Sequence, residues 1–466
     1  MHTARPSFVA LWLSLALGWS GCVSSPDRTP GPSIDLPSEW TAASDANTRA
    51  PEAWLEDLNA PQLHPLVTEA LRNNPNLQTT AARFEQSIAE ARIAGADLAP
   101  HAGLGLNTAR QKINTFGPQS TGGVRFENYE LNLNVRWELD LWGRLRDGTS
   151  AALAEVEARQ AELNAARLSL AAQVAKSWLN YSEAYQQVAL AEKTARSYQE
   201  NLQTLETRFR RGLAEGLDLR FIRTQAAAAE ADTHTRRRTL DQAARSLEVL
   251  LGRYPSAKLD AATDFPSLPT AIPAGLPAEL LARRPDLVAA ERRLAAMDKE
   301  VRAARKELLP RISLTGSTGT ASQSLGDLLN GDFSVWSLAA NLTQPIFQGG
   351  RIRANIDRTQ SLREQAAAGY RNAALQAFLE VETTLAAEAF LKNEYAHLAR
   401  AADEAAAAEA QAWERYRNGT IEFLNVLDIQ RTAATTQSRM IALRNALLQN
   451  RVDLYLALGG PFTPSS

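Results

Sequence analysis

Few residues in this chain have the type and spacing that metal binding or nucleophilic catalysis requires. The 466 residues include a single cysteine, Cys22, so the chain can form neither a disulfide framework nor a cysteine-based metal site. Its histidines show no metal-ligand spacing, and no phosphate-binding glycine loop or serine nucleophile elbow occurs. We therefore expect no metal, no cofactor and no enzymatic activity. The five histidines are His2, His64, His101, His234 and His397.

The position of Cys22 favours one modification, the attachment of lipid. An apolar run at 8–19 follows Arg5 and is too short to span a bilayer, but it has the length of a secretory signal core. The run ends in small residues before Cys22, which resembles a bacterial lipobox, where the cysteine is acylated and begins the mature chain. The alternative is an ordinary signal peptide that is cleaved elsewhere. We expect a signal peptide at 1–21, then a lipid anchor and extended strap at 22–62.

The positions of Pro and Gly in the first half of the chain recur in the second half. Pro75 recurs as Pro285, 210 residues later, and Gly212 recurs as Gly419, 207 residues later. A duplication that stays in register this far predicts two copies of one structural unit. We expect the first repeat at 63–252, a Pro-rich equatorial linker at 253–284, the second repeat at 285–459 and a tail at 460–466.

Very long helices dominate each expected repeat. Residues 149–211 contain neither Gly nor Pro, which permits about 95 Å of uninterrupted helix. Their apolar residues form a narrow stripe with three/four spacing, which indicates coiled-coil-like packing against neighbouring helices. The expected helices are 66–99, 149–211 and 217–251 in the first repeat, and 286–309, 351–418 and 420–458 in the second.

Each repeat also contains one pair of expected membrane strands. Residues 128–141 alternate strictly between apolar and polar, as a strand with one apolar and one wet face does. We expect β-hairpins at 101–142 and 311–347. Trp137, Trp142 and Trp336 are expected near membrane interfaces, where indole rings are enriched. For Trp142, core packing at the junction of strand and helix is an equal alternative.

Four membrane strands cannot close a barrel, and open sheet edges in lipid leave backbone groups without hydrogen-bond partners. Closed barrels need about eight or more strands. Two copies would supply eight strands and three copies would supply twelve. The physical argument therefore predicts an oligomer without choosing between these numbers.

The duplication and three further segments resemble the TolC/OprM-like outer membrane factors, and the lipobox resembles their NodT-type lipoprotein branch. The segments are LDLWGRLR (139–146), TQPIFQGGRIR (343–353) and YRNGTIEFLNVLDIQ (416–430). The resemblance implies a mainly α fold with membrane β structure, in which a homotrimer forms a 12-strand β-barrel on a 12-column α-helical barrel. It also implies a lipid-anchored protein in the outer membrane of a Gram-negative bacterium, extending into the periplasm.

The same resemblance implies an exit duct for small molecules such as drugs, in a tripartite efflux system. Its partners would be a periplasmic adaptor (membrane fusion protein), an inner-membrane pump of the RND type and outer-membrane lipid. The alternatives are the channel of a type I protein secretion system and a passive porin-like channel, although a porin does not need such long helices. With 50 basic and 52 acidic residues, nothing suggests nucleic acid binding. Only three methionines occur, which disfavours a copper or silver duct.

The two expected helix turns, at 211–217 and 418–424, are candidates for docking the adaptor. Each has a Gly where two long helices reverse, and we expect exposed apolar groups to follow it, including Phe423 and Leu424. In the resembling family, these turns present grooves to the adaptor. The alternative is plain turn chemistry. The candidate docking residues are Gly212, Leu213, Leu217, Gly419, Thr420 and Ile421.

The resemblance also places a periplasmic gate close to these turns. In the family, an acid matching Asp218 bonds the tyrosine matching Tyr416, and paired acids line the aperture. Asp428 matches the second of these acids, whereas Asn425 replaces the first, so we expect one carboxylate ring and a weaker cation preference. Ile421 replaces an arginine of some members, so fewer bonds hold the gate. The alternative for Asp218 is an acid that is favoured at a helix start by the helix dipole.

Overall fold

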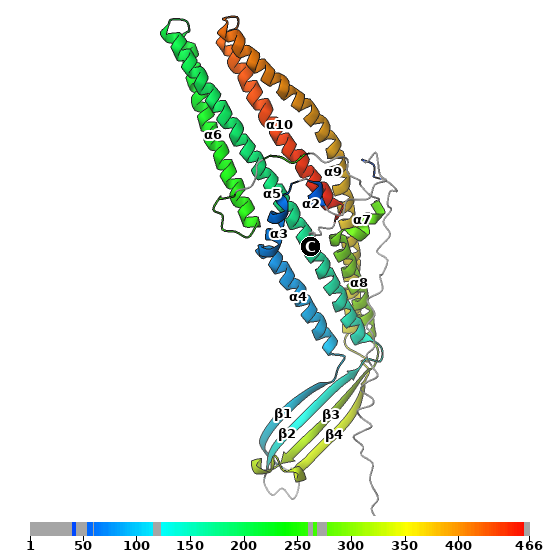
Figure 1. The fold of residues 1–466 in the computed structure, drawn as a ribbon. Coiled ribbons are helices and arrows are strands. Elements are labelled where there is room, and N and C mark those ends of the chain that lie inside the picture. Colours follow the sequence, from blue (N-terminus) through cyan, green and yellow to red (C-terminus); the bar gives the residue numbers. More distant parts are fainter. Residues whose placement is uncertain are drawn as a thin grey trace, which may run out of the picture. The chain divides into compact units, whose positions relative to one another are not determined.

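The computed structural model describes residues 40–42, 54–58, 60–114, 123–259, 264–267 and 277–460. Cys22, the expected signal peptide, most of the expected strap and residues 461–466 lie outside this part. The described chain divides into two compact units, each drawn from both halves of the sequence (Figure 1). The first unit comprises 86–157 and 291–368, and the second comprises the other described residues.

The helices of the two sequence halves match in length and order. Both α5 (Arg144–Arg210) and α9 (Arg351–Arg417) have 67 residues, and both α6 (Gly216–Leu250) and α10 (Phe423–Ala457) have 35. The shorter α4 (Pro75–Ala96) and α8 (Pro285–Lys306) have 22 residues each. The expectation of a mainly helical, duplicated protomer is therefore confirmed. The remaining helices are α2 (Trp54–Asp57), α3 (Leu63–Asn73) and α7 (Pro277–Arg283). No described helix combines the length and the apolar character that crossing a membrane would need.

Two helix boundaries differ from expectation because side chains cap the backbone. The carboxylate of Asp140 accepts the N–H groups of Leu145 and Arg146 at 3.0 and 2.9 Å, so α5 begins before residue 149. The expected helix 66–99 is instead two helices. Between them, the Asn74 side chain accepts the N–H groups of Asn76 and Leu77, and Pro75 opens α4.

The four strands form one antiparallel sheet in the order β1-β2-β3-β4. Its central pair, β2 with β3, joins the two repeats, from Tyr129 opposite Ser322 to Leu139 opposite Ile312. The alternating segment 128–141 forms most of β2, and β1 and β4 are the edges of the sheet in the part of the chain that the structure describes. The strands are β1 (His101–Ile113), β2 (Val124–Leu139), β3 (Arg311–Ser322) and β4 (Ser334–Thr343), with short 3-10 helices at Leu325–Asp327 and Gly331–Phe333.

The second unit has its largest apolar core where α2 and α3 pack against α5, α6 and α10. Trp54, Trp178 and Leu247 are among its fully buried side chains. A separate cluster buries Trp40, from the expected strap, against α9 and the end of α10. The backbone N–H groups of Thr41 and Ala42 donate to Glu382 at 2.8 and 2.9 Å, which fixes this short segment on α9.

A buried ion pair links α9 to α10 in the same unit. The side chain of Arg451 is 2% exposed and pairs with Glu388, which also accepts from Asn450 at 3.1 Å. Burial alone would raise the pKa of Glu388, but the hydrogen bond and charge of Arg451, with help from Lys392, lower it below its ordinary value.

Replacing Arg451 by Ala is expected to lower the free energy of unfolding by about 3–5 kcal/mol, because Glu388 would stay largely buried without its main cationic partner and would keep only the more exposed Lys392. Since the folded-state pKa of Glu388 is depressed, its stabilising contribution exists above the ordinary carboxyl pKa and declines as pH falls. Thermal unfolding of the detergent-solubilised protein at several pH values measures both effects. Glu388→Gln is the control, since it should remove that pH dependence. A loss below about 1 kcal/mol for Arg451→Ala, the median value of a surface pair, would contradict this account.

Candidate functional site at the paired helix tips

Two helix reversals in the second unit have the same backbone structure. At the first, between α5 and α6, the N–H of Leu213 donates to the Arg208 carbonyl at 2.9 Å. At the second, between α9 and α10, the N–H of Thr420 donates to the Arg415 carbonyl at the same distance. Gly212 and Gly419 have φ values of 68° and 72°, which this type of helix end requires and which L side chains rarely adopt. The backbone geometry of the helix ends is therefore enough to explain why glycine occupies both positions.

The apolar side chains of the two tips are not equally accessible. Leu213 and Leu217 are largely exposed at the first tip, and Leu424 is exposed at the second. Ile421 is half-buried against neighbouring apolar side chains. Phe423 is buried, so the expectation that it is exposed is wrong: its ring packs against the Tyr416 ring with centroids 5.4 Å apart. Thr420 is exposed, and its hydroxyl donates to the Arg415 carbonyl at 3.0 Å.

Behind the tips, all four helices share one apolar cluster, which we call the tip cluster. Tyr416 is buried in it, and Trp413 packs edge-on against its ring at 5.9 Å. The Arg208 guanidinium lies over the same ring, 4.8 Å from its centroid. Arg208 belongs to α5 and Tyr416 to α9, so this cation–π contact joins the two repeats near their tips. The tip cluster comprises Tyr198, Leu205, Leu219, Ile222, Ala226, Ala412, Tyr416, Phe423, Val426 and Leu427.

Arg208 was not among the residues expected from the sequence. Its Nε atom is buried without a hydrogen-bond partner among the described residues, so the aromatic ring is an important neighbour of this cation. The internal duplication could have pointed to Arg208. Arg208-Phe209 recurs as Arg415-Tyr416, 207 residues later, just before each tip glycine.

Asp218 lies in the first turn of α6 and is half-buried. Burial and the charges of Glu215 and Glu422 raise its pKa, although the backbone N–H of Glu215 opposes that shift by donating to the carboxylate. The pKa of Tyr416 is also raised, chiefly by burial and also by the Asp218 charge, while Arg208 opposes the rise. Asp218 and Tyr416 are therefore electrostatic neighbours. Within one chain, the Asp218 carboxylate accepts its hydrogen bond from the backbone N–H of Glu215, as an acid in the first turn of a helix commonly does.

The other two expected gate residues lie outside the tip cluster. Asn425 and Asp428 are exposed and one turn apart on α10, so they share a face of that helix. Asp428 accepts a hydrogen bond from Arg431 at 2.5 Å. The structure thus brings Asp218 and Tyr416 together with Arg208, and leaves Asn425 and Asp428 on a surface of α10.

The three tryptophans named from the sequence belong to the first unit. The indole N–H of Trp137 donates to the Leu98 carbonyl at 3.0 Å, and that of Trp142 donates to the Pro310 carbonyl at 2.7 Å. Both rings therefore tie the ends of strands to neighbouring backbone. Trp336, on β4, is the most exposed of the three.

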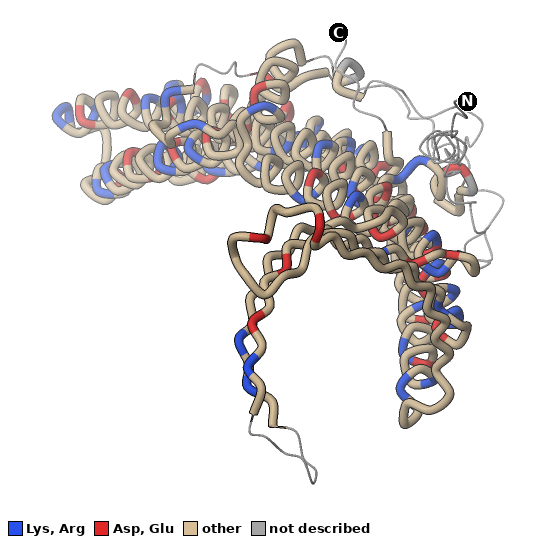
Figure 2. The backbone as a smooth tube through the Cα atoms, turned by 90° about the horizontal axis from the view of Figure 1, so that it is seen from below, with Lys and Arg blue, Asp and Glu red and all other residues tan. Residues whose placement is uncertain are grey.

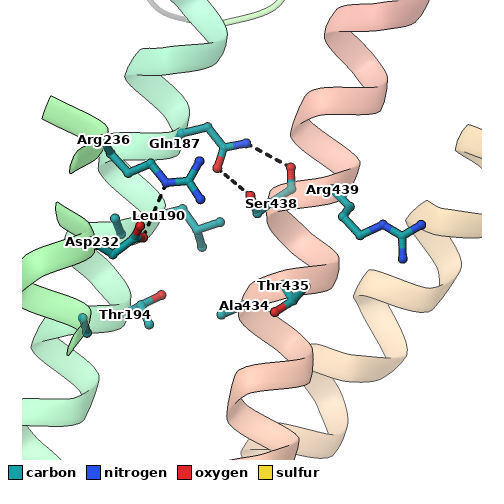
Figure 3. A pocket seen from close by; sticks show the side chains of 11 residues that line it. Gln187, Leu190, Thr194, Asp232, Arg236, Ala434, Thr435, Ser438 and Arg439 are labelled. Carbon is teal, nitrogen blue, oxygen red and sulfur yellow. Dashed lines mark hydrogen bonds and ion pairs between the residues drawn. The ribbon is translucent and has the colours of Figure 1, made fainter. Parts of the chain in front are cut away.

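The described residues include no cluster of His, Cys, Asp and Glu suited to a metal ion. Lys, Arg, Asp and Glu are interspersed along the helices and not gathered at one point (Figure 2). A groove of about 220 Å³ lies where α5, α6 and α10 meet, and Figure 3 shows its lining. Leu190 and Ala434 are among its apolar lining residues, and Asp232 and Arg236, which also line it, pair with each other at 3.4 Å on α6.

Comparison with known proteins agrees with this architecture. The family model "Outer membrane efflux protein" matches residues 66–253 and 276–460, that is, both repeats. The toluene efflux pump outer membrane protein TtgF of Pseudomonas putida is 32% identical over 98% of this chain and 97% of its own length. Outer membrane protein OprJ of Pseudomonas aeruginosa is 34% identical, over 98% and 96%. The solved structure of the outer-membrane channel OprN superposes with a TM-score of 0.87 at 27% identity, covering 95% of this chain and all of that one.

These matches extend over nearly the whole chain, including both tips and all four strands. They agree with a transport duct that lies in the outer membrane of a Gram-negative bacterium and extends into the periplasm. The chain therefore belongs to the outer membrane efflux protein family, whose members are efflux channels and not enzymes.

Proposed function

We propose that this protein is the exit duct for small organic molecules in a tripartite efflux system, with a periplasmic adaptor and an RND-type inner-membrane pump as partners. One observation carries the proposal. A single chain joins a four-stranded sheet to helices of 67 residues, about 100 Å long, and does so twice. A passive channel needs strands but no such helices, and a periplasmic spacer needs helices but no strands.

We propose that the protein is a homotrimer, because three copies can close their sheets into one barrel. The edges β1 and β4 have no partner strand among the described residues, and backbone groups left open in lipid cost several kcal/mol each. Three copies would supply twelve strands. Trp336 would lie at the membrane interface in this assembly, because an exposed indole ring favours the headgroup level.

Organic cargo fits this chain better than metal ions. The relative TtgF is named for toluene efflux, whereas CusC of Escherichia coli, 29% identical, is named for cation efflux. Soft metal ions such as copper(I) prefer thioether and thiolate ligands. The chain has only three methionines and one cysteine to offer along a duct.

Deleting the gene from its own host tests the proposal. We expect the deletion strain to accumulate an organic solvent or an amphiphilic dye under energised conditions, and to recover when the gene is restored. Its tolerance of silver and copper should not change. Lost metal tolerance with unaltered handling of organic compounds would contradict the assignment of cargo.

We also propose that Cys22, which lies outside the described residues, carries lipid. In Cys22→Ser, the protein should lose its acyl groups, each worth about 0.8 kcal/mol per buried CH₂. Export should fall only in part, since the strands would still insert. Intact-mass measurement of membrane-extracted protein checks this, with Ser20→Ala as a matched change nearby. An unmodified Cys22 in the parent protein would refute lipidation.

A further inference from the structure

The first hairpin, β1 with β2, carries a cluster of basic residues at the end that is farther from the helices (Figure 2). Arg110 lies opposite Glu127 in the strand register, and Lys112 lies opposite Arg125. All four residues share one face of the sheet, because successive side chains of a strand point to opposite faces. Together we call these four residues the basic rim.

The face that carries the basic rim is the apolar face of the sheet. Toward the helices, the next cross-strand pairs on this face are mostly apolar, namely Thr108 with Tyr129, Leu106 with Leu131, and Leu104 with Leu133. The other face of β2 is polar, and there Asn132 donates to Glu130 at 2.6 Å and accepts from Asn134 at 2.8 Å. In outer-membrane strands the apolar face is turned toward lipid. The basic rim is therefore on the lipid side of the sheet.

The position of the rim along the strands corresponds to the outer surface of the bilayer. Because β1 follows α4 and β2 leads into α5, the periplasmic helices are at one end of the hairpin and the rim is at the other. From Leu139 to Tyr129, β2 rises by roughly 25 Å along the membrane normal at the usual strand tilt, which is the height of the apolar band of such proteins. The rim begins two residues beyond Tyr129, at the level of the lipid headgroups.

The charges of the rim are not balanced among the described residues. Arg110 pairs with Glu127 at 2.9 Å, although 70% of its side chain is exposed. Lys112 and Arg125 are both exposed and have no acidic partner in the part of the chain that the structure describes. They are direct cross-strand neighbours, and like charges in this arrangement destabilise a sheet. An anion bound between them would remove this repulsion.

The second hairpin shows that the fold does not require these charges. Thr320 and Ser322 follow Arg110 and Lys112 by 210 residues and lie at the corresponding end of β3. Residues 312–350, which include the whole second hairpin, contain no Lys or Arg. The basic rim thus has no counterpart in the second repeat, which favours a binding role over a structural one.

We propose that the basic rim binds a phosphorylated glycolipid of the outer leaflet. Lys112 and Arg125 would donate hydrogen bonds to its phosphate groups, since both side chains suit phosphate. The leucines below the rim would contact its acyl chains. A free anion could use only the first of these contacts, so the combination of cations and an apolar stripe selects a lipid. The site lies within one hairpin and depends neither on the proposed trimer nor on the cargo.

Native mass spectrometry of the full-length, delipidated protein with added lipid A tests this proposal. Compared with the parent protein, K112Q with R125Q should bind lipid A about tenfold more weakly or worse, because hydrogen bonds to charged groups are among the stronger ones. The matched control is R136Q with R311Q, which also removes two basic side chains from strands, but from the opposite face. The control should bind like the parent. Equal binding by K112Q with R125Q and the parent would overturn the proposal.

Two further measurements use the parent protein alone and so do not depend on the folding of a variant. Lipid A without its phosphates should bind about tenfold more weakly, because only the apolar contacts remain. Inorganic phosphate at the same concentration should not displace lipid A. Undiminished binding of the dephosphorylated lipid would reveal adsorption to the apolar face only, and displacement by phosphate would reveal a simple anion site. Either result would overturn the proposal.

Discussion

Cells that carry Asp218→Ala together with Tyr416→Phe are expected to become sensitive to large antibiotics that normally cannot cross the outer membrane. Tyr416 is buried in the tip cluster, and its pKa responds to Asp218 and Arg208, so the three groups interact. We propose that in the closed trimer the Asp218 carboxylate accepts a hydrogen bond from the Tyr416 hydroxyl, and a hydrogen bond to a charged group is worth about 1.5–3 kcal/mol. In a trimer, three copies would weaken together, and each 1.4 kcal/mol changes the closed-to-open ratio about tenfold.

Arg208→Gln is expected to have an effect of the same sign, because it removes the cation over the Tyr416 ring. A partly desolvated cation–π contact contributes about 0.5–2 kcal/mol. Arg415→Gln is the matched control, since Arg415 is the repeat counterpart of Arg208 but is exposed. Growth inhibition by a glycopeptide antibiotic measures these effects. Unchanged resistance in both the double variant and Arg208→Gln would mean that the closure lies elsewhere in the duct.

Leu213→Asp together with Leu217→Asp is expected to abolish energised export almost completely while leaving the protein folded. Both side chains are exposed at the first tip, so charge there should cost little stability, within about 0.5 kcal/mol. We propose that this tip docks the periplasmic adaptor through its exposed leucines, so the change would place carboxylates in that apolar contact, where an unpaired charge is costly. Accumulation of a fluorescent organic substrate in energised cells measures the loss.

Tyr254→Asp provides the control for that variant, because Tyr254 is an exposed aromatic residue away from both tips. Its export should match that of the parent. Ile421→Asp should behave differently again, since Ile421 packs against the tip cluster and should lose stability as well as export. Full export in Leu213→Asp with Leu217→Asp would remove the first tip from the docking surface.

The larger features of this fold were accessible from the sequence because they depend on periodicity and on Gly and Pro. The strict alternation of 128–141 predicted a strand, and the long stretch without Gly or Pro predicted a helix of the right order of length. The tip glycines were found because a helix end with positive φ favours that residue type. Such signals are local in the chain, so one sequence is enough to show them.

Features that depend on contacts between distant segments were missed. Nothing local to Phe423 indicates that it packs under Tyr416, and an apolar residue after a turn was therefore expected to be exposed. Arg208 resembles its many exposed neighbours until α9 brings an aromatic ring over it. Asn74 was treated as one residue within a helix, although its side chain ends α3 and starts α4 by capping.

Single-channel recording from the purified full-length protein in a planar bilayer tests the central claim most directly. The claim is a continuous duct through the outer membrane that is closed at its helix tips. We expect the parent protein to insert and to show small, infrequent current steps, and Asp218→Ala with Tyr416→Phe to show steps several times larger. Inserted protein that conducts no current in either form would contradict the existence of a duct.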